Sequence, residues 1–332
     1  MADKIRWGIL STARIGQGAV IPAIQKSRNG EVVAVASRDL GRGQAFAKQA
    51  GIPKAYGSYE AMLADPEIDA IYNPLPNDQH GPWSIRAAEM GKHVLCEKPI
   101  ASNADEAQKM ADVFAKQGKL LMEAFMYPFH PQTVKVKAMV DSGAIGQIRL
   151  MTANFTFFID DEDDIRLKKD MSGGSLMDVG CYCVSVMRLM TGEEPDKVTA
   201  LARFGQRSQV DELMVGTLSF PSGAVGHFGC SFRSPLNQNY EVQGSEGRIL
   251  VERGFVPFRP DPKAPIIIRY WHGQGEGGTK YEEIPVEPAD QYTLMAEEFA
   301  DAILHKRSLR FPAEYSVKQM RVLDMLYAAA RG

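Results

Sequence analysis

A lysine between a glutamate and a proline follows a short apolar run. Glu97-Lys98-Pro99 comes directly after 93–96, whose sequence, HVLC, is typical of a strand buried on both faces. Open α/β sheets bind their ligands beyond the carboxyl ends of such strands. A lysine partly removed from water there, beside a glutamate, can have its pKa tuned for proton transfer. Lys98 is therefore a candidate acid–base group, and the alternative is a salt bridge on the surface.

A carboxylate and a phenol form a second candidate pair. Asp178 and Tyr182 are four residues apart in 175–190, a segment rich in Met and Cys that predicts a helix, so both would lie on one helix face. The carboxylate could orient a substrate hydroxyl or Lys98. The phenol could act as an acid–base group if a nearby cation lowers its pKa. The alternative is an aspartate at a helix start followed by a buried tyrosine.

The turn after the first apolar run, 5–10, could hold the phosphates of a dinucleotide. Ser11, Ala13 and Gly16 occupy the three glycine places of the G-x-G-x-x-G fingerprint. Ser and Ala are the next smallest residues after Gly, so backbone amides could still reach a phosphate at a helix N-terminus. The alternative is an ordinary turn between a strand and a helix.

The end of the second apolar run indicates which dinucleotide is bound. An enzyme that uses NAD would place an Asp or Glu at about Ser37 to bind the ribose. Here Ser37-Arg38 is followed by Arg42, and a hydroxyl with a guanidinium can bind a 2′-phosphate. We therefore expect NADP as the cofactor. NAD is the less favoured alternative, because Asp39 stands beside Arg38.

Short apolar runs alternate with helical patterns over the first 125 residues. The runs are 5–10, 31–37, 70–75, 93–96 and 120–124. This alternation predicts an α/β fold with a doubly wound parallel sheet, a Rossmann domain that binds NAD(P) over 1–125. After residue 125, strand-like segments follow one another without helices between them. They predict an α/β domain with an open, mainly antiparallel sheet over 126–332, for substrate binding and oligomerisation.

The composition excludes several classes of protein. The 332 residues carry 38 Lys and Arg against 41 Asp and Glu, so the net charge of −3 offers no general attraction for nucleic acid or an anionic membrane. No apolar run is long enough to cross a bilayer. The cysteines and histidines lack zinc-site spacing, so we expect reduced thiols and no metal. The first residues form no apolar leader, so we expect a cytoplasmic location.

Taken in order, these motifs resemble the glucose–fructose oxidoreductase/inositol dehydrogenase (Gfo/Idh/MocA) family. The resemblance rests on GILSTARIG at 8–16, on Glu97-Lys98-Pro99 and on GGSLMDVGCY at 173–182, and it covers essentially the whole chain. MEAFM at 122–126 and DVGCYC at 178–183 are most similar to the dimeric dihydrodiol dehydrogenases and NADP-dependent D-xylose 1-dehydrogenases of that family. The resemblance implies a Rossmann domain followed by an α/β domain with an open sheet.

The resemblance also assigns roles to individual residues. Lys98 would assist proton transfer, with a cis peptide before Pro99, and Asp178 and Tyr182 would fill the family's Asp-x-Gly-x-x-His/Tyr pattern. Whether Lys98 or Tyr182 is the principal base stays open. The expected cofactor contacts are Ser11, Thr12, Ala13, Arg14, Ile15, Ser37, Arg38, Arg42, Leu75, Pro76, Asn77, His80, Glu97 and Lys98. The expected substrate contacts are Phe125, Tyr127, Arg166, Asp178, Tyr182 and Tyr292.

These expectations combine in an NADP-dependent oxidoreductase that transfers a hydride between nicotinamide and a cyclic polyol or aldose. The substrate would be an aldopyranose such as D-xylose or D-glucose, oxidised at C1, or a trans-dihydrodiol. The alternatives are a glucose–fructose oxidoreductase-like enzyme that keeps NADP tightly bound and a non-catalytic sensor or regulator that binds NADP. An uncovered sheet face predicts a homodimer through the C-terminal sheet, with 148–158 and 224–232 as candidate strands.

Overall fold

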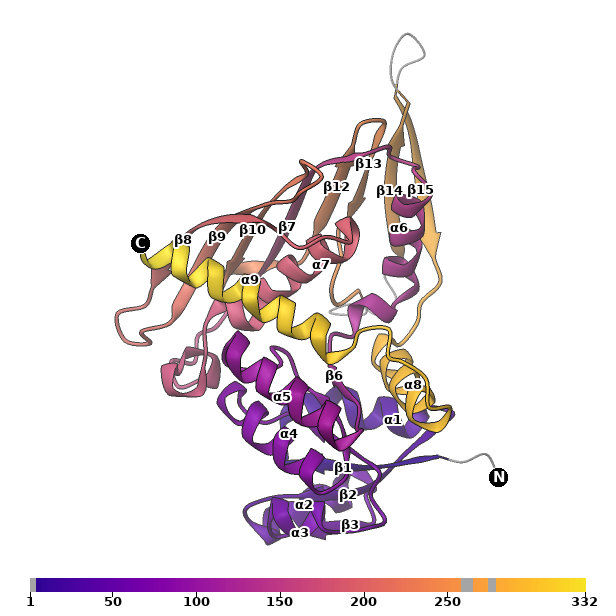
Figure 1. Ribbon diagram of the computed structural model, residues 1–332, viewed down its shortest axis with the longest axis vertical. Coiled ribbons are helices and arrows are strands. Elements are labelled where there is room, and N and C mark those ends of the chain that lie inside the picture. The colour runs from indigo at the N-terminus through magenta and orange to yellow at the C-terminus, as the bar shows by residue number, and fades with distance from the viewer. Residues whose placement is uncertain (1–3, 258–264, 274–278) are drawn as a thin grey trace. The chain divides into compact units, whose positions relative to one another are not determined.

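The five apolar runs and one further strand form a parallel sheet of six strands in the computed structural model, which describes residues 4–257, 265–273 and 279–332 (Figure 1). The strands are β1 (Ile5–Leu10), β2 (Gly30–Ala36), β3 (Lys54–Tyr56), β4 (Ala70–Asn73), β5 (His93–Cys96) and β6 (Leu121–Glu123). Their order is β3-β2-β1-β4-β5-β6, and every pair is parallel. Trp7, Ile9 and Leu95 are fully buried, because helices cover both faces. The predicted Rossmann architecture is confirmed.

Helices connect these strands. They are η1 (Gly16–Val20), α1 (Ile21–Lys26), α2 (Leu40–Ala50), α3 (Tyr59–Leu63), η2 (Asn77–Gln79), α4 (His80–Glu89) and α5 (Ala104–Gln117). Asn103 begins α5 by accepting a hydrogen bond from the Glu106 amide at 2.9 Å, and Gly118 ends it at φ 61°, a conformation that favours glycine. Across the described ranges, no helix is long and apolar enough to span a membrane.

The second sheet has nine strands within the described residues. They are β7 (Ile148–Phe158), β8 (Lys197–Phe204), β9 (Asp211–Ser219), β10 (Val225–Ser231), β11 (Arg233–Asn237), β12 (Tyr240–Gly244), β13 (Gly247–Val251), β14 (Ile266–His272) and β15 (Lys280–Val286). The order is β15-β14-β13-β12-β7-β10-β9-β8, with β11 paired to β7. Only the β7–β10 pair is parallel among these described strands, so the mainly antiparallel sheet is also confirmed.

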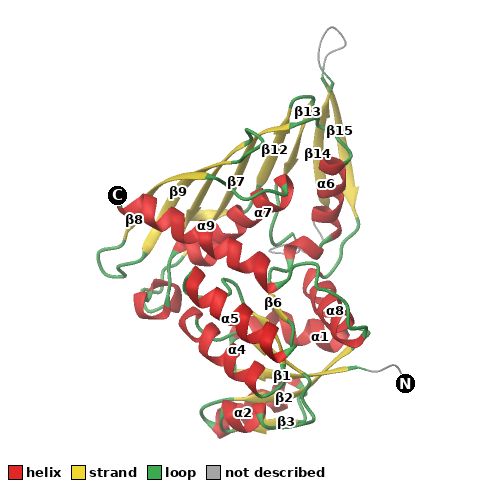
Figure 2. Cartoon of the chain, in the orientation of Figure 1, coloured by secondary structure: helices red, strands yellow, loops and turns green. Residues whose placement is uncertain are grey.

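One face of this sheet is packed and the other meets solvent. Met151, Ala153 and Phe155 alternate along β7 and are buried, and the helices of this unit lie along one face of the sheet (Figure 2). On the other face, Leu201 is 75% exposed and its partner across the β8–β9 pair, Val215, is 44% exposed. The helices and short turns of this part are η3 (Tyr127–Phe129), α6 (Pro131–Asp141), η4 (Ile165–Leu167), η5 (Lys169–Met171), η6 (Leu176–Gly180) and α7 (Cys181–Thr191).

The contacts divide the chain into two units, Met1–Met126 with Asp290–Met320, and Tyr127–Ala289 with Arg321–Gly332. The helix α8 (Gln291–Leu304) therefore belongs to the first unit, and α9 (Ala313–Arg331) passes from the first to the second. This division differs from a single boundary at 125/126. The reason is the buried face of α8, where the Phe299 ring lies 5.5 Å from the ring of Trp7 in β1.

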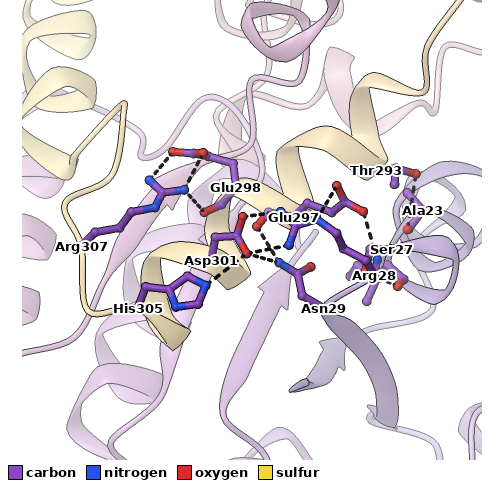
Figure 3. A network of polar contacts seen from close by, with 11 residues as sticks. Ala23, Ser27, Arg28, Asn29, Thr293, Glu297, Glu298, Asp301, His305 and Arg307 are labelled. Atoms are coloured by element: carbon purple, nitrogen blue, oxygen red, sulfur yellow. Dashed lines mark hydrogen bonds and ion pairs between the residues drawn. The ribbon is translucent and has the colours of Figure 1, made fainter. Parts of the chain in front are cut away.

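Polar contacts join α8 to the chain just before β2 (Figure 3). The Arg28 amide donates to Glu297 at 3.0 Å, and its guanidinium forms an ion pair with Asp301. The Asn29 side chain donates to the Glu297 carbonyl oxygen at 3.0 Å and to Asp301 at 2.7 Å. These long-range bonds fix α8 against the parallel-sheet unit.

Candidate active site

The turn after β1 begins with a left-handed residue and leads directly into a helix. Ser11 has φ 69°, in the left-handed region, and its amide donates to the Ala36 carbonyl at the end of β2. The helix that follows begins near Arg14 and continues through η1 and α1. Thr12, Ala13 and Ile15 are half-buried and Arg14 is exposed. The backbone amides at this helix start remain candidates for binding a phosphate, the role that the spacing predicts.

The end of β2 presents two guanidinium groups to solvent. Arg38 and Arg42 are exposed, and both charges act on the pKa of the nearby Tyr59 phenol, opposing the rise caused by its burial. The Asp39 carboxylate, which had kept NAD as an alternative, accepts a hydrogen bond from the Arg42 amide at 2.8 Å and caps α2. Ser37 is buried beside this cap. Ser37, Arg38 and Arg42 therefore remain the candidate contacts for a 2′-phosphate, and Asp39 has a structural role as the cap of α2.

His80 holds two loops at the same edge of the sheet. Its Nδ1 lies 2.7 Å from the Pro99 carbonyl oxygen and its Nε2 lies 2.8 Å from that of Leu75. Burial lowers the pKa of His80 to about 4, and the charge of Lys98 contributes in the same direction. Because both ring nitrogens face backbone carbonyls, His80 supports the segment with Pro76 and Asn77 instead of offering a nitrogen to a cofactor.

Lys98 lies directly beyond β5, half-buried, and the peptide before Pro99 is cis, as the resemblance implied. Glu97 beside it accepts a 2.6 Å hydrogen bond from the Tyr72 hydroxyl. Tyr72 is fully buried in β4, and burial together with the Glu97 charge holds the pKa of its phenol well above the usual range. Tyr292, at the start of α8, also raises the pKa of Tyr72 and therefore lies near this pair. Sequence reasoning did not identify Tyr72, since a tyrosine in an apolar strand has no distinguishing pattern.

In the second unit, Asp178 is paired with Arg166. Arg166 Nε donates to Asp178 Oδ2 at 2.9 Å, and its Nη1 contacts Asp164 at 3.2 Å. Asp178, foremost, and Asp164 raise the pKa of the Arg166 guanidinium. Asp178 lies in η6, a π-helical turn, a local widening that is frequent at functional sites. Arg166 was expected to contact substrate, and in the structure its guanidinium binds Asp178.

Tyr182 is enclosed by aromatic rings. Its ring centroid lies 5.9 Å from that of Tyr127, 5.3 Å from Phe155 and 5.4 Å from Phe255. Tyr127 is itself fixed by a 2.8 Å hydrogen bond between its hydroxyl and that of Ser185 on α7. Such apolar surroundings exclude water and strengthen electrostatic interactions. Sequence reasoning did not identify Phe255, which stands in a segment without strand or helix periodicity.

The predicted residues thus form two groups, one in each unit. The first unit carries the turn after β1, the arginines after β2, the His80 loop and Glu97-Lys98 at the carboxyl edge of its sheet, together with Phe125 and Tyr292. The second carries Tyr127, Arg166, Asp178 and Tyr182. In the described part of the chain, no three His, Cys, Asp or Glu side chains are grouped as metal ligands.

Two family profiles match the chain. The profile described as "Oxidoreductase family, NAD-binding Rossmann fold" matches residues 5–125, and the "GFO/IDH/MocA C-terminal domain" matches 133–250. A D-xylose 1-dehydrogenase (NADP(+)) of Haloferax volcanii is 43% identical over 325 residues, 98% of this chain and 97% of its own. The trans-1,2-dihydrobenzene-1,2-diol dehydrogenase of Mus musculus is 36% identical over 258 residues, 76% of each chain.

A solved structure has the same fold over nearly the full length. It is KijD10, a 3-ketoreductase from Actinomadura kijaniata in complex with NADP and TDP-benzene. The TM-score is 0.90 at 31% sequence identity, and the alignment covers 98% of both chains.

Proposed function

The chain belongs to the Gfo/Idh/MocA oxidoreductase family, and from this we propose that it oxidises an aldopyranose such as D-xylose or D-glucose at C1. The observation that carries the proposal is the place of Lys98. It is half-buried beyond β5, beside a glutamate fixed by a buried tyrosine, at the sheet edge where the nucleotide turn also lies. A lysine held there is suited to exchange a proton with a substrate hydroxyl.

The cofactor is NADP. We infer that the amides of the turn Ser11–Ile15 bind its pyrophosphate and that Ser37, Arg38 and Arg42 bind its 2′-phosphate. The accessible helix start and the two exposed guanidiniums support this assignment. When bound, NADP⁺ supplies the hydride acceptor of the reaction.

Residues of the chain would accept the proton of the substrate hydroxyl and orient the substrate. Either Lys98 or Tyr182 takes the proton of the substrate hydroxyl, and Asp178, fixed by Arg166, orients that hydroxyl. Arg166 is a single positive charge between the carboxylates of Asp178 and Asp164, so the formal charge of this group of three is negative. We therefore assign the stabilisation of a developing alkoxide to Lys98 and not to Arg166.

A trans-dihydrodiol is the second candidate substrate. The observation in its favour is the set of rings around Tyr182, formed by Tyr127, Phe155 and Phe255. Aromatic side chains of this kind stack on a planar, largely apolar ring. A sugar can also pack its apolar face against such rings. The rings therefore do not distinguish the two candidate substrates, and an activity assay is needed.

The test is the reduction of NADP⁺ by the purified protein, followed by the absorbance of reduced nicotinamide, with aldoses, polyols and trans-dihydrodiols offered in parallel. Turnover of an aldopyranose with a lactone as product supports the proposal. Interconversion of two sugars without added cofactor would favour the glucose–fructose oxidoreductase-like alternative. Tight NADPH binding without turnover of any compound would favour the sensor.

We expect Arg38 to determine the preference for NADP over NAD. Replacing Arg38 by Ala removes a charge-assisted phosphate contact, which corresponds to roughly a 10- to 100-fold rise in the Kd of NADPH, while the Kd of NADH stays within about twofold. Fluorescence titration measures both constants. Lys48→Ala, which removes an exposed charge from α2, the helix that follows Arg38, serves as the control. Equal weakening of both nucleotides by Arg38→Ala would contradict the assignment.

We propose that the solvent-exposed sheet face pairs with a second copy of the chain. Leu201, Val215 and Val225 expose apolar side chains on this face, around a shallow hollow of about 540 Å³ that Leu201, Val215 and His227 help to line. Symmetric pairing would remove this surface from water. All four cysteines are buried thiols, and we further propose a reducing, cytoplasmic location.

Sedimentation tests the pairing. The wild-type protein is expected to be a dimer at micromolar concentration, and Leu201→Asp is expected to be a monomer, because each copy would bring a charge into the apolar contact. Val134→Asp, which places the same charge on an exposed position of α6, should remain dimeric. A monomeric wild-type protein would refute the proposal.

A further inference from the structure

Asp211, the first residue of β9, is a buried carboxylate with three hydrogen-bond donors. It is 1% exposed. The Tyr327 hydroxyl donates to its Oδ1 at 2.7 Å, and the Ser175 hydroxyl and the Leu176 amide donate to its Oδ2 at 2.8 and 2.7 Å. Burial raises the pKa of Asp211, and the donated hydrogen bonds act in the opposite direction. Nothing in the chemistry described above uses this group.

The donors show which segment of the chain Asp211 holds in place. Ser175 and Leu176 are where η6 begins, and Asp178 lies two residues further on. A carboxylate that accepts hydrogen bonds at a helix start is a strong cap, because it satisfies an amide and favours the helix dipole. Tyr182 follows in α7, which continues η6 without a break. Asp211 therefore fixes the start of the helix that carries both proposed active-site residues of the second unit.

The two glycines before this helix are explained by the same contact. Gly174 has φ 130°, and a Cβ on it would lie 2.2 Å from Asp211 Oδ1. A Cβ on Gly173 would lie 2.3 Å from the backbone oxygen of Arg166, to which the Gly174 amide donates at 2.9 Å. The Gly-Gly pair is thus enclosed by Asp211 on one side and by the Arg166 loop on the other. Since Arg166 binds Asp178, the start of η6 and the Asp178 side chain both depend on this packing.

We propose that Asp211 is a positioning residue that sets the place of Asp178 and Tyr182 for reaction. The proposal rests on the proposed function, because it assigns Asp211 to the same site. It predicts that loss of the carboxylate lowers kcat while substrate and NADP still bind. Positional errors of about 1 Å in reacting groups can lower rates by roughly a hundredfold, so the effect should be large.

The first experiment compares Asp211→Ala with Asp211→Asn. The alanine variant loses all three hydrogen bonds, and its kcat should fall roughly 30- to 100-fold with less than about a threefold change in KM or in the Kd of NADPH. Asparagine keeps the shape and can turn its oxygen towards Ser175 and Leu176 and its amide towards Tyr327. Its kcat should stay within about fivefold of wild type.

Two further sets of variants separate positioning from lost stability. Ser175→Ala and Tyr327→Phe each remove one donor and should lower kcat by smaller factors than Asp211→Ala, which keeps the test available if that variant does not fold. Ile249→Ala opens a cavity in β13, in the same unit and away from η6. It should lower Tm and leave the kcat of the folded enzyme unchanged.

The results distinguish the two proposals. Wild-type kcat in Asp211→Ala, or a loss in Ile249→Ala equal to that in Asp211→Ala, would overturn the positioning role. If the wild-type protein turns over no compound offered, the proposed function fails, and amide hydrogen exchange over 175–182 still tests the anchor. Exchange there should become faster in Asp211→Ala and not in Asp211→Asn. Unchanged exchange in Asp211→Ala would overturn the inference.

Discussion

Replacing Lys98 by Ala is expected to lower kcat about a thousandfold, since a positioned acid–base group contributes roughly a hundred- to ten-thousandfold. The Kd of NADPH should change less than about threefold, because the proposed phosphate contacts lie at β1 and β2. Steady-state kinetics and nucleotide titration measure the two effects. Wild-type turnover in Lys98→Ala would exclude Lys98 from the chemistry.

Lys92 provides a matched control at the other end of the same strand. It is 6% exposed, and its Nζ donates to the carbonyl oxygens of Asp65 at 2.6 Å and Ile68 at 2.8 Å. Lys92→Met leaves these carbonyls without that donor and should lower Tm. The kcat of the folded variant should remain that of the wild type. The pair of variants therefore separates a structural lysine from one that acts on the substrate.

Replacing Tyr182 by Phe is expected to lower kcat by roughly a hundred- to a thousandfold with little change in KM. The ring stays packed among Tyr127, Phe155 and Phe255, so only the hydroxyl is lost. Tyr240→Phe is the control, since Tyr240 is equally buried and its ring lies 6.0 Å from that of Phe255. Its kcat should not change. A Tyr182→Phe enzyme with wild-type kcat would limit Tyr182 to packing.

Together the two variants identify the principal base. The dependence of kcat/KM on pH reports the essential groups of the free enzyme. Loss of the principal base should remove the rising limb of that profile. Loss of the other group should lower the plateau and keep the limb. The comparison is made on Lys98→Ala and Tyr182→Phe under the same conditions.

The features that could be predicted from the sequence depend on residues that are close together in the chain. Continuous apolar runs led to five of the six parallel strands, whereas the three-residue β3 has no such run, and segments that follow one another without helices led to the antiparallel sheet. The position of Lys98 at the carboxyl end of β5 followed from one apolar run and the residues after it. Arg38 and Arg42 were likewise predicted from the residues that come after β2. In each case the relevant partners are close in sequence or are set by the strand direction.

The features that were not predicted depend on pairs of residues that are far apart in the chain. Asp211 and Tyr327 are separated by 116 residues, and Asn29 and Asp301 by 272. No periodicity links such positions, so neither the anchor of η6 nor the packing of α8 on the first unit could be read from the sequence. Tyr72 is a further case, because only the fold brings it to Glu97.

The proposed reaction is the passage of a hydride between the substrate carbon and the nicotinamide, while Lys98 or Tyr182 accepts the proton of the substrate hydroxyl. Its most direct test uses an aldose with deuterium at C1, chosen from the compounds that turn over, and mass spectrometry of the NADPH formed by the wild-type enzyme. We expect the deuterium in the NADPH and a lactone as the other product. NADPH without deuterium, or label released to water, would contradict hydride transfer from C1.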